Sequence, residues 1–172
     1  MLINILETAF NLIFTLNENL LEIISLSLKV TLSALIISVS ISIPFGAFLV
    51  FYKNKIQSFI VLVSNTLMGM PPVVLGLIIY TLVSKKGIFG FLDILYTPSA
   101  MILAQTLLIS PIVISLTYEE IFKKNKQYNL LLNSLNLSNI SKLKTLIYES
   151  RYSLLTVTLT GFGRASAEVG AV

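Results

Sequence analysis

Three long stretches of the chain carry no charged side chain. They comprise residues 30–52, 56–84 and 98–118, with lengths of 23, 29 and 21 residues. A helix of about 20 apolar residues crosses a hydrocarbon core of about 30 Å. Because backbone groups in lipid must find partners within the protein, such stretches fold as helices. The pattern predicts an all-α integral membrane protein, with a fourth span over residues 152–172.

Composition and charge exclude several other classes of protein. Hydrophobic residues make up 55% of the 172 and charged residues 12%, with a mean hydropathy of +0.89. The chain has no Cys and no His, which excludes disulfides and Cys/His metal sites. Its net charge of +4 is spread over loops, so we expect no nucleic-acid partner. We expect one transmembrane domain over residues 1–172, with spans near residues 23–52, 58–84, 98–118 and 152–172.

Lysine and arginine are distributed unevenly among the loops. Eight follow the first or the third expected span, and only Lys85 and Lys86 lie between the second and the third. Cytoplasmic loops are enriched in these residues, so residues 119–151 are expected in the cytoplasm and the N-terminus outside. Lys29 then stands at the outer end of the first span, where its stem can reach the headgroups. The first twenty residues lack Lys and Arg, and we expect an interfacial segment there rather than a secretory signal.

Consecutive prolines, Pro71 and Pro72, interrupt the second charge-free stretch. They remove two backbone donors and disfavour helix in the residue before them. Two readings remain open. Either the span begins near Pro72 and the preceding residues are partly interfacial, or the helix is broken within the membrane. A broken helix is tolerated at that depth only where protein or water satisfies the freed carbonyls.

The expected cytoplasmic loop has an amphipathic helical pattern. Its apolar residues recur mostly at three- and four-residue intervals and are Leu130, Leu131, Leu132, Leu135, Leu137, Ile140, Leu143, Leu146 and Ile147. The pattern is interrupted near Asn136, a residue type that adopts left-handed backbone angles more readily than most, which predicts a turn between two short helices. An apolar stripe outside the membrane must be covered by headgroups, by the chain itself or by another protein.

The last expected span contains one pair of charges, Arg164 and Glu168, among small residues. Residues four apart lie on one helix face and can pair. Ionisable groups at membrane depth usually face a protein interior or a water-filled path, so this pair is a candidate gate or a structural clamp. Gly161 and Gly163 are expected to be helix-packing positions beside that path. The spans also contain hydroxyl donors, which more commonly bond their own helix backbone: Ser64, Thr66, Thr106, Ser110, Thr156, Thr158 and Thr160.

Four segments resemble the permease subunits of ABC importers. MGMPPVVLGLIIYTLVSKKGIFG (residues 68–90) is similar to the double-proline span and outer loop of molybdate- and tungstate-type permeases. LYTPSAMILAQ (95–105) and ESRYSLLTVTLTGFGRASAEVGAV (149–172) are similar to the tungstate branch. LLLNSLNLSNISKLKTLIYESR (130–151) matches the family's cytoplasmic loop in layout. There Leu130 replaces a glutamate, Leu131 and Leu132 replace two alanines, and Asn136 replaces a glycine.

The resemblance implies a type I permease fold and a homodimer in the bacterial inner membrane. It implies that two copies of an ATP-binding subunit dock on residues 130–137, and that a periplasmic or lipid-anchored binding protein delivers an oxyanion. Tungstate is the expected cargo, with molybdate, sulfate or phosphate as alternatives. The chain has no GxxxxGK[ST] loop, so we expect no ATPase activity in it and no cofactor.

Two alternative classes of protein and the length of the fold remain to be considered. A membrane enzyme would need a catalytic constellation, and the chain offers no His, no Cys and a single aspartate, Asp93. A non-transporting membrane scaffold would tolerate the amphipathic loop but would not require Arg164 and Glu168. Permeases of the family continue beyond the position of Val172, so we expect a fold truncated at its C-terminus, either a working short form or a fragment.

Overall fold

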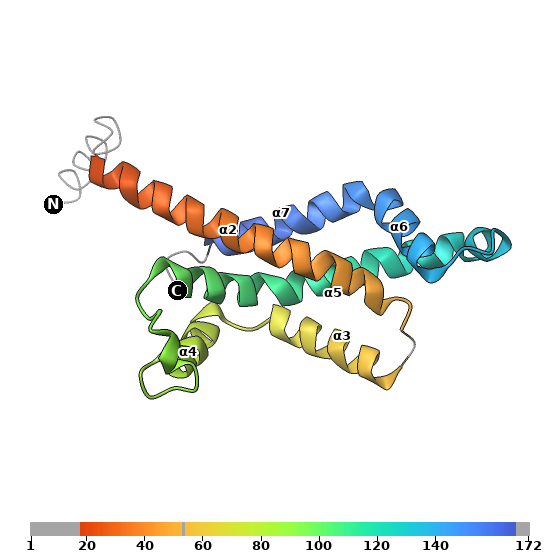
Figure 1. The fold of residues 1–172 in the computed structure, drawn as a ribbon. Helices are drawn as coiled ribbons and strands as arrows, with labels where there is room; N and C mark the ends of the chain where they lie inside the picture. The colour runs from red at the N-terminus through yellow and green to blue at the C-terminus, as the bar shows by residue number, and fades with distance from the viewer. Residues whose placement is uncertain (1–17, 53, 168–172) are drawn as a thin grey trace.

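The computed structural model describes residues 18–52 and 54–167. Within these ranges the chain is helical and contains no strand, which confirms the all-α prediction (Figure 1). The elements are α2 (Glu18–Leu49), α3 (Lys55–Met68), α4 (Pro72–Val83), the short 3-10 helix η1 (Gly90–Leu92), α5 (Pro98–Ser134), α6 (Asn139–Glu149) and α7 (Arg151–Ala167). The expected interfacial segment lies almost entirely outside the described residues, as does Glu168.

Helix α5 is the axis of the bundle. The other five α-helices of the described chain comprise α2, α3, α4, α6 and α7, and each of them contacts it (Figure 1). The main core lies where α2, α5 and α7 meet, and its buried members are Ala34, Leu35, Ile109, Val113, Val157 and Ala165. A second cluster joins the ends of α2 and α5 to α6, and a third joins α4 to the start of α5. The bundle is therefore assembled around one long helix.

Two described helices are long and apolar enough to cross a membrane, α5 and residues 20–49 of α2. The pair α3 and α4 passes the same test together, but the two helices meet at an angle of 109°. The described part of α7 is 17 residues long, and the rest of the expected fourth span lies outside the described residues. The described residues thus contain two candidate spans, or three if α3 and α4 form one, and the four spans stay a prediction.

The third expected span and the first helix of the cytoplasmic loop are one helix. The sequence analysis ended the span at Tyr118, whereas α5 continues to Ser134 and has 37 residues. No glycine or proline occurs between these positions, and the Glu, Lys and Gln residues there favour helix. At 1.5 Å per residue α5 is about 55 Å long, so it extends well beyond a hydrocarbon core of about 30 Å.

Helix α2 also differs from its predicted bounds. It begins at Glu18, an acidic residue that suits the positive end of a helix dipole, and ends at Leu49 rather than Tyr52. Lys29 therefore lies inside a helix and not at the end of one, and its side chain is exposed. Pro44 lies within α2 and Pro111 within α5 without ending either helix.

Helix α2 packs closely against α5 at Gly46. A Cβ atom added there would lie 2.8 Å from the Ile114 carbonyl oxygen and 3.1 Å from the Thr117 Cβ atom. Both distances are shorter than ordinary van der Waals contact, and the nearer atom belongs to backbone that cannot rotate away. The absence of a side chain at Gly46 allows the two longest helices to pack against each other.

We expect Gly46→Ala to lower the free energy of unfolding by about 1–3 kcal/mol, because the added methyl group overpacks the α2–α5 contact. Gly163→Ala is the matched control, since a Cβ atom there meets nothing within 4 Å among the described residues. The control should leave stability unchanged or raise it by about 0.5–1 kcal/mol through backbone entropy. Thermal unfolding in detergent measures both, and equal midpoints for the two variants would contradict the assignment.

Candidate functional site

The double proline stands at a break between two helices. Helix α3 ends at Met68, Pro71 has an extended backbone with φ −62° and ψ 133°, and α4 starts at Pro72. The helix is interrupted here, as both interpretations of the sequence require, and whether α3 lies at the interface or within the membrane stays a prediction. Helix α3 has 14 residues, so it carries the chain about 20 Å from Lys55. If Lys55 stands at headgroup level, the break lies deep within the hydrocarbon core.

Arg164 on α7 contacts this break directly. Its guanidinium Nη2 donates a hydrogen bond to the carbonyl oxygen of Met70 at 3.3 Å, across 94 residues of sequence. In a continuous helix that carbonyl would accept from the N–H of Val74. The Val74 N–H donates instead to Pro71 at 3.1 Å. Arg164 therefore supplies the donor that the broken helix lacks. Its predicted pairing with Glu168 lies outside the described residues and stays a prediction.

The two glycines near Arg164 differ in their surroundings. A Cβ atom on Gly161 would meet side chains of three residues on α2 and α5: Ile109 at 3.0 Å, Val113 at 3.4 Å and Leu35 at 3.5 Å. Gly161 is therefore a packing position, as expected. Gly163 has open space around it within the described chain. Gly163 contacts neither α2 nor α5, and its role as a packing position stays a prediction.

A polar seam between α3 and α5 was not found by sequence reasoning. The Ser115 hydroxyl donates to the side-chain oxygen of Asn65, and the Gln57 amide donates to the Tyr118 hydroxyl at 2.8 Å. These bonds fix α3 along α5. A signal was present in the sequence, because an Asn or Gln within a charge-free span needs a partner. Periodicity alone does not say which partner.

The hydroxyl groups in the spans mostly bond their own helices, as expected from Ser and Thr in apolar helices. Five threonines donate to the carbonyl four residues earlier: Thr66, Thr106, Thr156, Thr158 and Thr160. Ser110 does the same to Thr106 at 2.6 Å and also contacts the Ser38 hydroxyl at 3.2 Å. That expectation is confirmed. These groups are not arranged as a continuous row of free donors in the described structure.

The end of α5 and helix α6 form a hairpin, which we call the α5–α6 hairpin (residues 119–149). Its turn contains Asn136 with φ 50°, which confirms the left-handed turn predicted there. Leu132 and Leu146 are buried against the ends of α2 and α5, and Leu137 is half-buried. Leu130, Leu131 and Leu135 are exposed, with Leu130 84% accessible. The predicted stripe is therefore divided between an inner face that the chain covers itself and an outer face that it does not.

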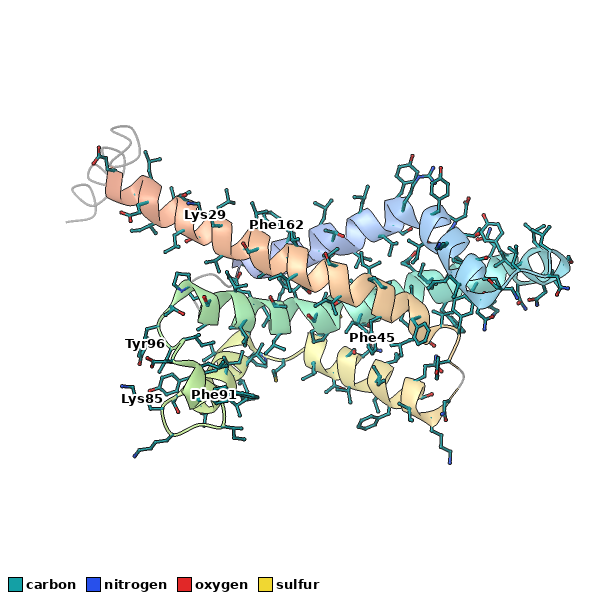
Figure 2. The ribbon with its side chains drawn as sticks, in the orientation of Figure 1. Lys29, Phe45, Lys85, Phe91, Tyr96 and Phe162 are labelled. Carbon is teal, nitrogen blue, oxygen red and sulfur yellow. The ribbon has the colours of Figure 1, made fainter. Side chains whose placement is uncertain are left out.

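The opposite end of the bundle consists of α4, η1 and the loop before α5. Lys85, Phe91 and Tyr96 gather there, far from the α5–α6 hairpin (Figure 2). Asp93 and Tyr96 have left-handed backbones, with φ 47° and 64°. Hydrogen bonding with the Tyr80 side chain raises the pKa of Tyr96 above its ordinary value. The exposed aromatic and apolar side chains of this loop form a second surface that the described chain does not cover.

Comparison with known proteins identifies the family. No family model matches the chain. The chain is 36% identical over 164 residues to the tungstate uptake system permease protein TupB of Campylobacter jejuni, covering 95% of this chain and 69% of that protein. It is 32% identical to the TupB protein of Peptoclostridium acidaminophilum, covering 96% and 73%. It is 30% identical to a probable anion ABC transporter permease of Haloferax volcanii, covering 89% and 66%. The chain belongs to the ABC transporter permeases.

The resemblance to the molybdate- and tungstate-type family of ABC permeases, closest to the tungstate branch, was drawn from the residues alone and is confirmed. The apolar helices are consistent with an integral membrane protein. The two uncovered surfaces, the outer face of the α5–α6 hairpin and the loop after α4, lie at opposite ends of the permease (Figure 2).

We expect Leu132→Ala to lower the free energy of unfolding by about 2–5 kcal/mol, because it empties a buried position in the hairpin core. Its neighbour Leu131 is 57% exposed, and Leu131→Ala should change stability by no more than about 0.5 kcal/mol. Thermal unfolding of the two detergent-solubilised variants makes the comparison. A larger loss for Leu131→Ala would show that the two faces of the hairpin have been assigned the wrong way round.

Proposed function

We propose that this permease is the membrane-spanning subunit of an importer that carries an oxyanion, tungstate in the first place, across the bacterial inner membrane. The observation that carries the proposal is the 36% identity, over 95% of this chain, to a permease named for tungstate uptake. The exposed apolar helices and the two uncovered ends support a membrane subunit that works with partners on both sides. ATP hydrolysis in a partner drives transport.

The translocation path passes the α3–α4 break and Arg164. A tetrahedral dianion is strongly hydrated and needs hydrogen-bond donors along its route, because charged groups are costly to desolvate. The break is the place where irregular backbone reaches membrane depth, which is tolerated beside a cavity or protein. Glu168 and the small residues Gly161 and Gly163 belong to the same segment, and we place them beside this path.

Two copies of an ATP-binding subunit dock on a homodimer of the permease. They contact the outer face of the α5–α6 hairpin, where the exposed Leu130, Leu131 and Leu135 flank the turn at Asn136. Leu132 and Leu137 support that face from within. A periplasmic or lipid-anchored binding protein delivers the anion to the opposite end, where Phe91 is 79% exposed and Tyr96 87% exposed. Apolar side chains at such exposure are typical of a surface that meets a partner or lipid.

Uptake into proteoliposomes tests the function. The permease is reconstituted with the ATP-binding and binding proteins of the same bacterium, and ATP-dependent accumulation of tungstate is measured against molybdate, sulfate and phosphate. We expect tungstate to accumulate and to compete with labelled molybdate. Accumulation of molybdate, sulfate or phosphate without tungstate would show that the permease carries that anion and not tungstate. Failure to hold any ATP-binding subunit in mild detergent would favour a non-transporting membrane scaffold.

Leu135→Glu should reduce uptake and permease-stimulated ATP hydrolysis more than about tenfold, because it places an unpaired charge in the docking surface. Leu135→Met is the control, since it keeps an apolar side chain of similar volume and should retain both activities. The measurement is ATP hydrolysis by the reconstituted complex with and without binding protein. Normal stimulation of ATP hydrolysis in the Leu135→Glu complex would show that the ATP-binding subunit does not dock on this face.

Orientation can be measured with single cysteines, because the chain contains none of its own. We expect Ile88→Cys to react with a membrane-impermeant maleimide in intact spheroplasts, since the loop after α4 faces outward. Ser141→Cys on α6 should react only after the membrane is permeabilised, because the lysine-rich hairpin faces the cytoplasm. Both positions are exposed, so accessibility within the protein does not limit the labelling. The reverse pattern would invert the topology.

A further inference from the structure

Helices α6 and α7 are joined as one stiff arm. Ser150 alone separates them, and its N–H donates to the Leu146 carbonyl at 3.0 Å while its own carbonyl accepts from the Leu154 N–H at 2.8 Å. Helical hydrogen bonding therefore runs through the corner. Arg151 lies over the rings of Tyr148 and Tyr152, at 4.4 and 4.8 Å from their centroids. Cation–π contacts at this corner add to its rigidity.

The far end of this arm reaches the helix break. Gly161 and Ala165 of α7 are buried, and α7 lies against α2 and α5 along this part of its length. From the same stretch Arg164 extends to the Met70 carbonyl. The α6–α7 arm therefore extends from the α5–α6 hairpin to the junction of α3 with α4.

The two halves of the broken helix are held differently. Helix α3 is tied to α5 by the side-chain hydrogen bonds of Asn65 and Gln57. The contacts of α4 with α5 are apolar and lie toward its outer end, at Ile79 and Val83 against Ala104. Apolar contacts do not fix the orientation of α4, whereas directional side-chain hydrogen bonds fix the orientation of α3. The link between the halves contains two prolines without N–H groups, so no helical hydrogen bond holds α4 in line with α3.

We propose that Arg164 is a positioning residue that sets the orientation of α4 relative to α3, because it holds the Met70 carbonyl at their junction against α7. This deepens the proposed function, because it assigns the contact that shapes the proposed path at the helix break. The placement of α4 itself does not depend on which anion is carried.

The proposal is tested by distances between spin labels in the cysteine-free chain. Labels are placed at Val73→Cys on α4 and Leu155→Cys on α7, both exposed positions, in lipid nanodiscs. We expect one narrow distance distribution in the parent protein. Arg164→Met should raise the ratio of detached to docked α4 about tenfold, since a hydrogen bond from a charged donor is lost. Arg164→Lys keeps a charged donor and should stay near the parent distribution.

A second background shows whether Arg164 acts through the break. Replacing both prolines, Pro71→Ala with Pro72→Ala, allows the Met70 carbonyl to accept from the Val74 N–H within a continuous helix. In that background Arg164→Met should no longer change the distribution, because the carbonyl has another donor. Such non-additivity is the signature of two sites acting on one interaction. An equal effect of Arg164→Met in both backgrounds would overturn the proposal, as would no effect in either.

A control pair monitors the rest of the bundle, with labels at Ile41→Cys on α2 and Leu107→Cys on α5. Its distance should be the same in all variants. If Arg164→Met disturbs the control pair as well, Arg164 holds the whole bundle and the specific role in α4 is wrong. Uptake is measured in parallel. Absent uptake with the expected distances would refute the proposed function and leave the placement of α4 standing.

Discussion

The organisation of this permease depends on a backbone carbonyl that has no helical partner, that of Met70 at the break between α3 and α4. Two prolines break the helix after Met70, and in lipid a group freed in this way must find its donor within the protein. Arg164 provides the donor from 94 residues away. Hydrogen bonds to charged groups contribute about 1.5–3 kcal/mol, enough to favour one orientation of a short helix. The contact explains why a break and an arginine occur in spans that are otherwise apolar.

The long helix α5 connects the packed bundle to the α5–α6 hairpin as one continuous element. Its first half packs against α2 and α7 through apolar side chains, and its second half forms the α5–α6 hairpin together with α6. The leucines of that hairpin have two roles. Leu132 and Leu146 face inward and hold the hairpin to the bundle, and so Leu130, Leu131 and Leu135 remain on a surface of fixed shape. A partner that docks there meets a rigid face and not a flexible loop.

Local chemistry was predictable from the sequence, and long-range pairing was not. Charge-free length predicted the helical class, the double proline predicted a break or a boundary, and Asn136 predicted its left-handed turn. The continuation of α5 past Tyr118 was missed because the change from apolar to polar residues was taken as the end of a helix, although nothing there breaks one. The bonds from Ser115 to Asn65 and from Arg164 to Met70 depend on how the spans pack, and neither periodicity nor spacing encodes them.

The contact of Arg164 also bears on what its charge can do. A guanidinium cannot be deprotonated in a protein, so at membrane depth it must be solvated by dipoles or by opposite charge. The carbonyl end of α3 carries the negative end of a helix dipole, and Met70 lies just beyond it. Part of the arginine's hydrogen-bonding capacity and field is therefore directed at the protein. In the proposed translocation path, an anion would therefore meet a cation whose hydrogen bonds are partly used by the protein, which favours a weak and reversible encounter over tight binding.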